Sequence, residues 1–229
     1  YLIGLNAASL KLKAAVGQGF RAPSLYEVGY NAGPFALPPA AGLALNAEKS
    51  SGYEFGAEYS RSGLSLEIVA FRQDVEDAID FDLASYSGYL QLAGTNHSEG
   101  LELLGRAQLS ERFSATANLT INNTERANGL QRLRRPKQLL NLGLGYVDAA
   151  ERLRINAFYR RAQSAIDEVA GTVVALDDFG VLDLNASYTL RGGIEVFARL
   201  ENAGDTSYRE IADYRSADRA AFVGLRFTL

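Results

Sequence analysis

The chain has 229 residues, a formal net charge of −4 and 47% hydrophobic residues, including 12 tyrosines and 11 phenylalanines. This composition is typical of a folded protein, and the nearly balanced charge offers no basic surface for nucleic acid. Because the chain has no cysteine and a single histidine, disulfides, thiol catalysis and zinc sites built from cysteine or paired histidines are excluded. The sequence also lacks methionine, so we expect Tyr1 to begin a fragment or a processed product.

Alternation of apolar and polar residues dominates the sequence. Between residues 182 and 190, for example, leucine, alanine and tyrosine occupy the even positions and mostly polar residues the odd ones. A period of two predicts strands with one apolar and one polar face. In chain order, about eleven strands are predicted, near residues 1–6, 9–21, 49–61, 63–82, 87–109, 112–125, 138–148, 151–163, 179–191, 193–202 and 219–229.

The connections between these strands alternate in length. Turns of one to a few residues, such as Ser62 and Gly192, alternate with longer segments. A soluble sandwich gives no reason for every long loop to lie at one end, whereas outer-membrane barrels have short periplasmic turns and longer extracellular loops. The uncharged stretch 28–47 contains three prolines, so it is interpreted as a loop and not as a membrane helix. The longer segments are 22–48, 83–86, 126–137, 164–178 and 203–218.

The residues on the two faces of the strands predict which face lines a lumen and which face contacts lipid. The polar face carries many charged residues, among them Lys13, Glu58 and Arg226, which a dry core could not hold unpaired. We therefore expect this face to line a wet lumen, while apolar runs such as 64–70 and 140–146 face lipid. The predicted fold class is all-β, an antiparallel transmembrane β-barrel. Because single-chain bacterial barrels have an even number of strands, further strands are expected before Tyr1.

Several segments resemble the signatures of TonB-dependent outer-membrane receptors. They are GQGFRAPSLYEVGY (17–30), NAEKSSGYEFGAEY (46–59), AFRQDVEDAIDFD (70–82), GTNHSEGLEL (94–103), LRRPKQLLNLGLGY (133–146) and the ending 182–229. The match follows the chain in order and is most similar to the vitamin B12 and catecholate-siderophore branch. It departs from the family at 216–219, where Ser-Ala-Asp-Arg replaces a Pro-Gly-Arg type of turn, and at Leu229, where an aromatic residue is usual.

The resemblance implies that residues 1–229 are the C-terminal part of a barrel of about 22 strands, with an N-terminal plug domain that is not in this chain. It implies TonB-energised uptake of a scarce ligand, such as a ferric siderophore or cobalamin, across the outer membrane of a Gram-negative bacterium. The implied partners are outer-membrane lipid and lipopolysaccharide, the TonB complex through the plug, the barrel-insertion machinery and a small-molecule ligand. The alternatives are a passive porin-like channel without a plug, or a barrel without a transport function.

One charged segment is a candidate for ligand binding. The loop 126–137, here called the basic loop, carries Arg126, and its second half holds four further cations. Such a cluster attracts anionic ligands; the alternative is surface charge that meets lipopolysaccharide phosphates or neighbouring acids. The predicted ligand-binding residues are Arg132, Arg134, Arg135 and Lys137.

Alternating carboxylates at Asp74, Glu76, Asp80 and Asp82 are a candidate calcium site, since Ca²⁺ takes six to eight oxygen ligands. The alternative is solvated charge above the membrane, and no other cofactor is predicted. The C-terminal residues Gly224, Phe227 and Leu229 resemble the signal that the insertion machinery reads, although they also suit an ordinary closing strand.

No phosphate-binding loop, Ser-His-Asp set or carboxylate pair of plausible geometry is found, so no enzyme activity is predicted. The lone histidine, His97, is interpreted as a side chain of the barrel wall or lumen.

Overall fold

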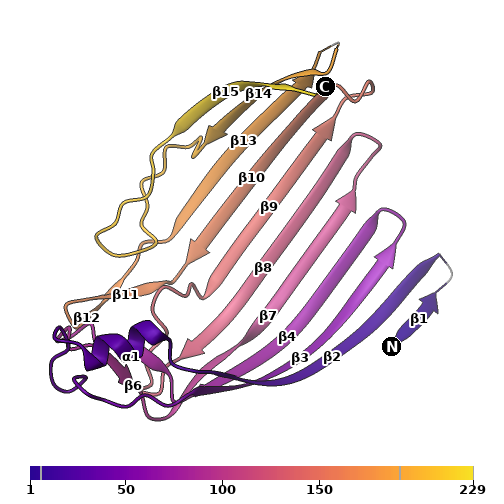
Figure 1. Cartoon of the computed structure of the whole chain (residues 1–229). Helices are drawn as coiled ribbons and strands as arrows, with labels where there is room; N and C mark the ends of the chain where they lie inside the picture. Colours follow the sequence, from indigo (N-terminus) through magenta and orange to yellow (C-terminus); the bar gives the residue numbers. More distant parts are fainter. Residues whose placement is uncertain (6, 191, 229) are drawn as a thin grey trace.

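The computed structural model describes residues 1–5, 7–190 and 192–228. Eleven strands form one antiparallel sheet in which neighbours along the chain are neighbours in space, which confirms the predicted fold class (Figure 1). The sheet does not close on itself within this chain. Its strands are β1 (Leu2–Leu5), β2 (Ala8–Arg21), β3 (Glu48–Arg61), β4 (Leu64–Glu76), β7 (Thr95–Gln108), β8 (Phe113–Glu125), β9 (Gln138–Val147), β10 (Leu153–Gln163), β13 (Phe179–Thr189), β14 (Ile194–Glu201) and β15 (Ala220–Phe227).

Short turns and long loops lie at opposite ends of the sheet, as the alternation of lengths predicts (Figure 1). The long loops carry the remaining elements: helix α1 (Leu25–Ala32), the hairpin of β5 (Ile79–Phe81) with β6 (Tyr89–Gln91), and the hairpin of β11 (Ile166–Val169) with β12 (Thr172–Ala175). No helix in the described part of the chain is long and apolar enough to cross a membrane.

One pair of predicted strands is wrong in its bounds. Strands were expected at 63–82 and 87–109, but β4 ends at Glu76 and β7 begins at Thr95. Asp77 has a φ of 56°, in the left-handed region, and this turns the chain out of the large sheet. Ile79–Phe81 then pairs with Tyr89–Gln91 as a separate hairpin. The connection expected at 83–86 is therefore a long loop, residues 77–94.

The segment 22–48 is a loop that also contains α1. Ser24 begins the helix with a capping box: its hydroxyl accepts a hydrogen bond from the Glu27 amide at 3.2 Å, and the Glu27 carboxylate accepts one from the Ser24 amide at 2.6 Å. These reciprocal bonds satisfy amide groups that a helix start leaves free. The Glu27 carboxylate also lies 3.0 Å from Arg21, so the helix is tied to the end of β2.

The two faces of the sheet have the expected character. Side chains on the apolar face point away from protein, and Leu66 and Leu144 are 48% and 59% exposed. On the polar face, Lys13 bridges Glu58 at 2.8 Å and Glu67 at 2.5 Å on neighbouring strands. An exposed apolar face and an ion-paired polar face suit a sheet between lipid and a wet lumen.

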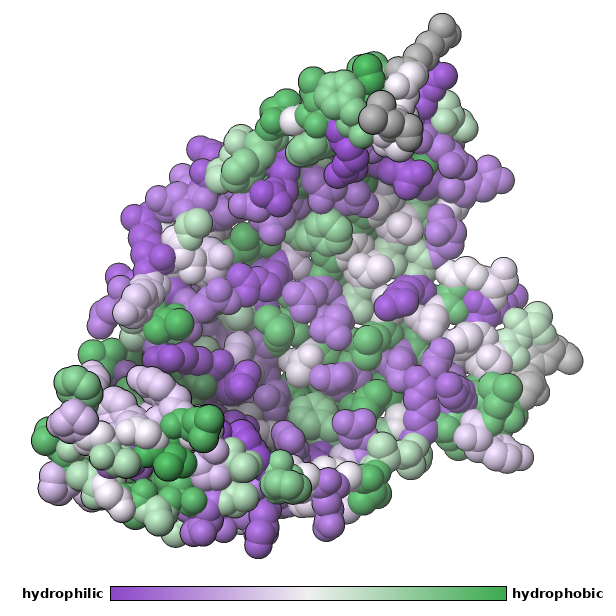
Figure 2. Space-filling view, in the orientation of Figure 1, coloured by the Kyte–Doolittle hydropathy of each residue, from purple (hydrophilic) through white to green (hydrophobic). Residues whose placement is uncertain are grey.

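Hydrophobic burial is concentrated at the loop end. In residues 1–5, 7–190 and 192–228, the buried hydrophobic side chains are Ala40, Ala78, Ile79, Ala162, Phe179 and Val181. Figure 2 shows hydrophilic side chains spread over the face of the sheet turned to the viewer, and hydrophobic ones gathered over the region of α1 and β6. Leu25, Tyr26 and Phe35 are strongly exposed in that region.

A close approach of β7 and β8 requires glycine at position 100. A Cβ added to Gly100 would overlap the carbonyl oxygen of Ile121 and lie 2.9 Å from the Phe71 ring. We expect Gly100→Ala to destabilise the full receptor by about 1–3 kcal/mol, as overpacking does. Thermal unfolding and heat-modifiable electrophoretic mobility would measure this effect.

Gly52→Ala is the matched control, because its added Cβ would find its nearest atom, the Arg72 carbonyl oxygen, 3.9 Å away. Equal unfolding temperatures for the two variants would contradict the prediction.

Candidate functional site

The basic loop folds onto the polar face of the sheet. The Ala127 amide donates to Oδ1 of Asn96 at 3.0 Å, and the Arg132 amide donates to Oγ1 of Thr124 at 3.2 Å. The Arg132 guanidinium donates to Oγ of Ser98 at 3.3 Å. Asn96, Ser98 and Thr124 are buried as a result. The loop therefore covers polar positions of β7 and β8 and does not extend away from the strands.

A buried carboxylate joins three long loops. Asp167, fully buried in the β11–β12 loop, accepts hydrogen bonds from Nε of Arg134 at 2.9 Å and from the Ala212 amide at 2.7 Å. Arg134 belongs to the basic loop and Ala212 to the loop 202–219. Burial alone would raise the pKa of Asp167, but the amides of Ala212 and Glu168 and the Arg134 guanidinium lower it below its usual range. Asp167 is therefore charged at neutral pH.

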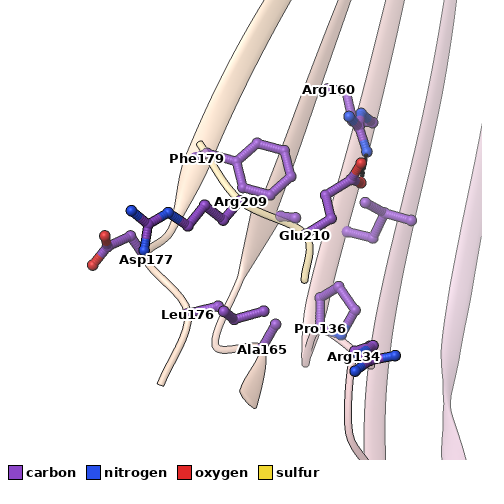
Figure 3. Close-up of a pocket in the computed structure, with 11 residues that line it drawn as sticks. Arg134, Pro136, Arg160, Ala165, Leu176, Asp177, Phe179, Arg209 and Glu210 are labelled. Carbon is purple, nitrogen blue, oxygen red and sulfur yellow. Dashed lines mark hydrogen bonds and ion pairs between the residues drawn. The ribbon is translucent and has the colours of Figure 1, made fainter. Parts of the chain in front are cut away.

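Beside this joint lies a small hollow with an aromatic wall (Figure 3). The Phe179 ring stacks on Tyr208, with 4.4 Å between centroids, and the Arg160 guanidinium lies 5.2 Å from the Phe179 centroid. Arg160 also donates to Glu210 at 2.5 Å. The hollow has a volume of about 200 Å³, and Arg134 stands at its edge. It can accept a small apolar or flat group beside a cationic rim.

A larger, polar hollow shares Arg134 with the first one. Its volume is about 580 Å³, and it lies between the basic loop, the ends of β4 and β7, and the β5–β6 hairpin. Asp80 and Glu48 supply its carboxylates, and Glu48 is already bound to Arg21 at 2.6 Å.

Three of the four predicted ligand-binding residues line these hollows. Arg132, Arg134 and Arg135 border the polar hollow, although Arg134 is also committed to Asp167. Lys137 lines neither hollow. Its backbone amide donates to the Gln163 carbonyl at 3.0 Å, where the basic loop joins β9.

The four acidic residues of the predicted calcium site lie in different parts of the structure. Asp74 is on the same side of the sheet as the apolar residues of β4. Its Oδ1 lies 2.7 Å from Nδ1 of His97, and Arg72 lies next to it. Glu76 is exposed and pairs across the sheet with Lys49.

The other two acids lie in the β5–β6 region. Asp82 accepts hydrogen bonds from Ser85 and Ser87, which lower the pKa of its carboxyl well below the usual range. Asp80 lies in the polar hollow. Nowhere in the described residues do three or more acidic or histidine side chains converge as a metal site would require. Calcium binding stays a prediction from the sequence.

The C-terminal residues have local structural roles. Gly224 lies opposite Phe197 on β14, and a Cβ added there would overlap the Phe197 ring. Phe227 is exposed at the end of β15, and Leu229 lies outside the described residues. The assembly signal itself stays a prediction.

Sequence reasoning did not single out Asp167, Arg160, Phe179 or Tyr208. Phe179 carried a usable signal, because it is a large aromatic residue at a polar-face position. Asp167 carried none, since its partners lie 33 and 45 residues away along the chain.

The chain is similar to a known family of proteins. The family model for the TonB dependent receptor-like β-barrel matches residues 3–203. The vitamin B12 transporter BtuB of Photobacterium profundum is 22% identical over 220 residues, which cover 94% of this chain and 35% of the relative. BtuB of Vibrio cholerae is 20% identical, with 94% of this chain and 34% of the relative covered. The chain thus spans about a third of the length of these curated relatives.

Solved structures have the same fold. The copper transporter OprC superposes with a TM-score of 0.80 at 19% identity, covering 99% of this chain and 38% of that one. The ferripyoverdine receptor of Pseudomonas aeruginosa gives 0.73 at 15% identity, covering 99% and 32%. The chain therefore has the same fold as the matching part of these barrels. The chain belongs to the TonB-dependent receptor β-barrel family, whose relatives here are transporters and receptors, not enzymes.

The Asp167 joint makes a testable prediction about the loops. Asp167→Asn removes the charge that Arg134 binds and one of the two acceptors that the amides use. We expect hydrogen–deuterium exchange in the full receptor to rise about tenfold in 126–137, 164–178 and 202–219 together, since a lost charged hydrogen bond costs about 1.5–3 kcal/mol. The wall strands should be unchanged.

Asp218→Asn serves as the control, because Asp218 forms an exposed ion pair with Arg215 at 2.6 Å. Faster exchange confined to 164–178 would show that Asp167 does not join the three loops.

Proposed function

We propose that this chain forms the C-terminal part of the barrel wall, with extracellular loops, of a receptor that imports a scarce ligand through the outer membrane of a Gram-negative bacterium. The energy would come from the TonB complex, acting on a plug domain outside this chain. Family membership and the names of the relatives support this class of function. A ferric siderophore or cobalamin is the kind of ligand proposed.

The observation that carries the proposal is the position of the loops. The basic loop and the loops joined at Asp167 lie against the polar face and form two adjacent hollows with a cationic border. A passive pore is best served by an unobstructed path, whereas a receptor needs a shaped, charged site that retains its ligand. The folded loops therefore favour a receptor.

The remaining partners follow from the same proposal. Exposed apolar side chains such as Leu66 and Leu144 would contact lipid, and charged groups near the loop ends of the strands would meet lipopolysaccharide. The last strand would be read by the barrel-insertion machinery.

Replacing residues 203–218 with a short Gly-Ser turn tests the proposal. This change removes Tyr208, Glu210 and the Ala212 amide, while β14 and β15 keep their pairing. We expect normal insertion, shown by heat-modifiable mobility, together with at least about a tenfold loss of uptake. Uptake of labelled cobalamin and a panel of ferric siderophores would be measured in cells that express the full receptor.

The control replaces the short turn 109–112 at the opposite end, and uptake should then be unchanged. The same assay in cells without TonB decides the mechanism. Uptake that persists without TonB would overturn the active mechanism and favour the passive channel.

A further inference from the structure

The polar hollow is bordered by arginines whose hydrogen-bonding capacity the surrounding protein does not fully use. Four arginines border it, namely Arg126, Arg132, Arg134 and Arg135, against the carboxylates of Asp80 and Glu48. Arg134 is bound to Asp167, and Glu48 is bound to Arg21. Arg126 lies near Glu168. In the described part of the chain, Arg132 and Arg135 have no ion pair.

Arg126 is the most constrained of these groups. Its side chain is 13% exposed, and its nearest carboxylate oxygen, on Glu168, is 3.6 Å from Nη1. Nε and Nη2 are buried and have no hydrogen-bond partner in the residues that the structure describes. A buried charged donor without an acceptor is costly. Water could accept these bonds, but an anionic oxygen would form stronger, charge-assisted ones.

Asp80 does not fill this need. It makes no hydrogen bond to Arg126 or Arg132 within the described structure, although both lie near enough to act on it electrostatically. The surrounding protein raises the pKa of its carboxyl by partial desolvation, and the two arginines only partly oppose that effect, although the residue stays exposed to solvent. Because Asp80 lines the same hollow as the arginines, an incoming anion would be attracted by the arginines and repelled by the Asp80 carboxylate.

We propose that the polar hollow is a subsite for an anionic oxygen group, a carboxylate or a phosphate, held between Arg126 and Arg132 with Asp80 opposing it. Arg132 is already oriented by Ser98 at 3.3 Å. Guanidinium groups suit this role because their forked donors match both anions. The inference rests on the proposed function, since the anionic group would belong to the ligand that the receptor captures.

Binding of two probes to the purified full receptor tests the subsite. Inorganic phosphate and tricarballylate, each titrated calorimetrically at constant ionic strength, represent the two sources of the anionic group. We expect at least one to bind at millimolar concentration or below. Arg126→Gln and Arg132→Gln should each weaken that binding about tenfold or more. Asp80→Asn should strengthen it several-fold, because a repelling charge is removed.

Arg215→Gln is the matched control, with the same change of charge in an exposed loop arginine, and its binding should equal that of the wild type. Arg126→Lys is a second variant in case Arg126→Gln disturbs folding. It keeps the positive charge but loses the forked donors of the guanidinium, so it should retain part of the affinity. The strengthening by Asp80→Asn is a result that damage to the structure would not produce.

The outcomes separate the two proposals. If neither probe binds the wild-type receptor, or if the Arg126 and Arg132 variants bind as well as Arg215→Gln, the subsite is overturned, even where TonB-dependent uptake is intact. If the probes bind with the expected dependence but no uptake requires TonB, the subsite stands and the proposed transport function falls.

Discussion

A lipid bilayer offers no hydrogen-bond partner to a peptide group, so a chain that crosses it by strands must pair each strand with its neighbours. The eleven-stranded meander meets this requirement, with β3, β4, β7 and β8 paired over nearly their whole lengths. Because this pairing satisfies the backbone, the two faces of the sheet differ only in the side chains that they carry. The sequence therefore alternates, and the apolar residues that a soluble protein would bury are turned outward.

The wall has no dry core, so the side chains that pack together are found mainly at the loop end of the sheet. There, rings from three segments meet: Tyr30 of α1 lies 5.7 Å from Phe81 and 5.8 Å from Tyr89, both edge-on. Asn31 adds two hydrogen bonds to the Tyr89 backbone, at 2.8 and 3.0 Å. These contacts give the loops a tertiary structure of their own, which the regular wall only supports.

Alternation was enough to predict the wall, because the period of a strand is a local property. It failed at Asp77. Val75, Ile79 and Phe81 still alternate with polar residues, but they occupy the opposite parity from the apolar residues of the wall, and the backbone turns at Asp77 with a φ of 56°. The basic loop was visible as a run of charge. The aromatic hollow and the Asp167 joint were not, because they arise only when loops distant in the chain meet over one face of the sheet. The calcium prediction shows the converse: carboxylates that alternate along a strand need not converge in space.

The Asp167 joint also has a consequence for how this receptor can diversify. Loops at the mouth of a barrel usually vary in length independently of one another. Here a single carboxylate accepts hydrogen bonds from residues in two other loops, at 2.9 and 2.7 Å. An insertion in any one of the three would pull its donor or acceptor away from the other two. Such insertions should therefore be inherited with compensating changes in the partner loops, so that the mouth evolves as a unit around Asp167.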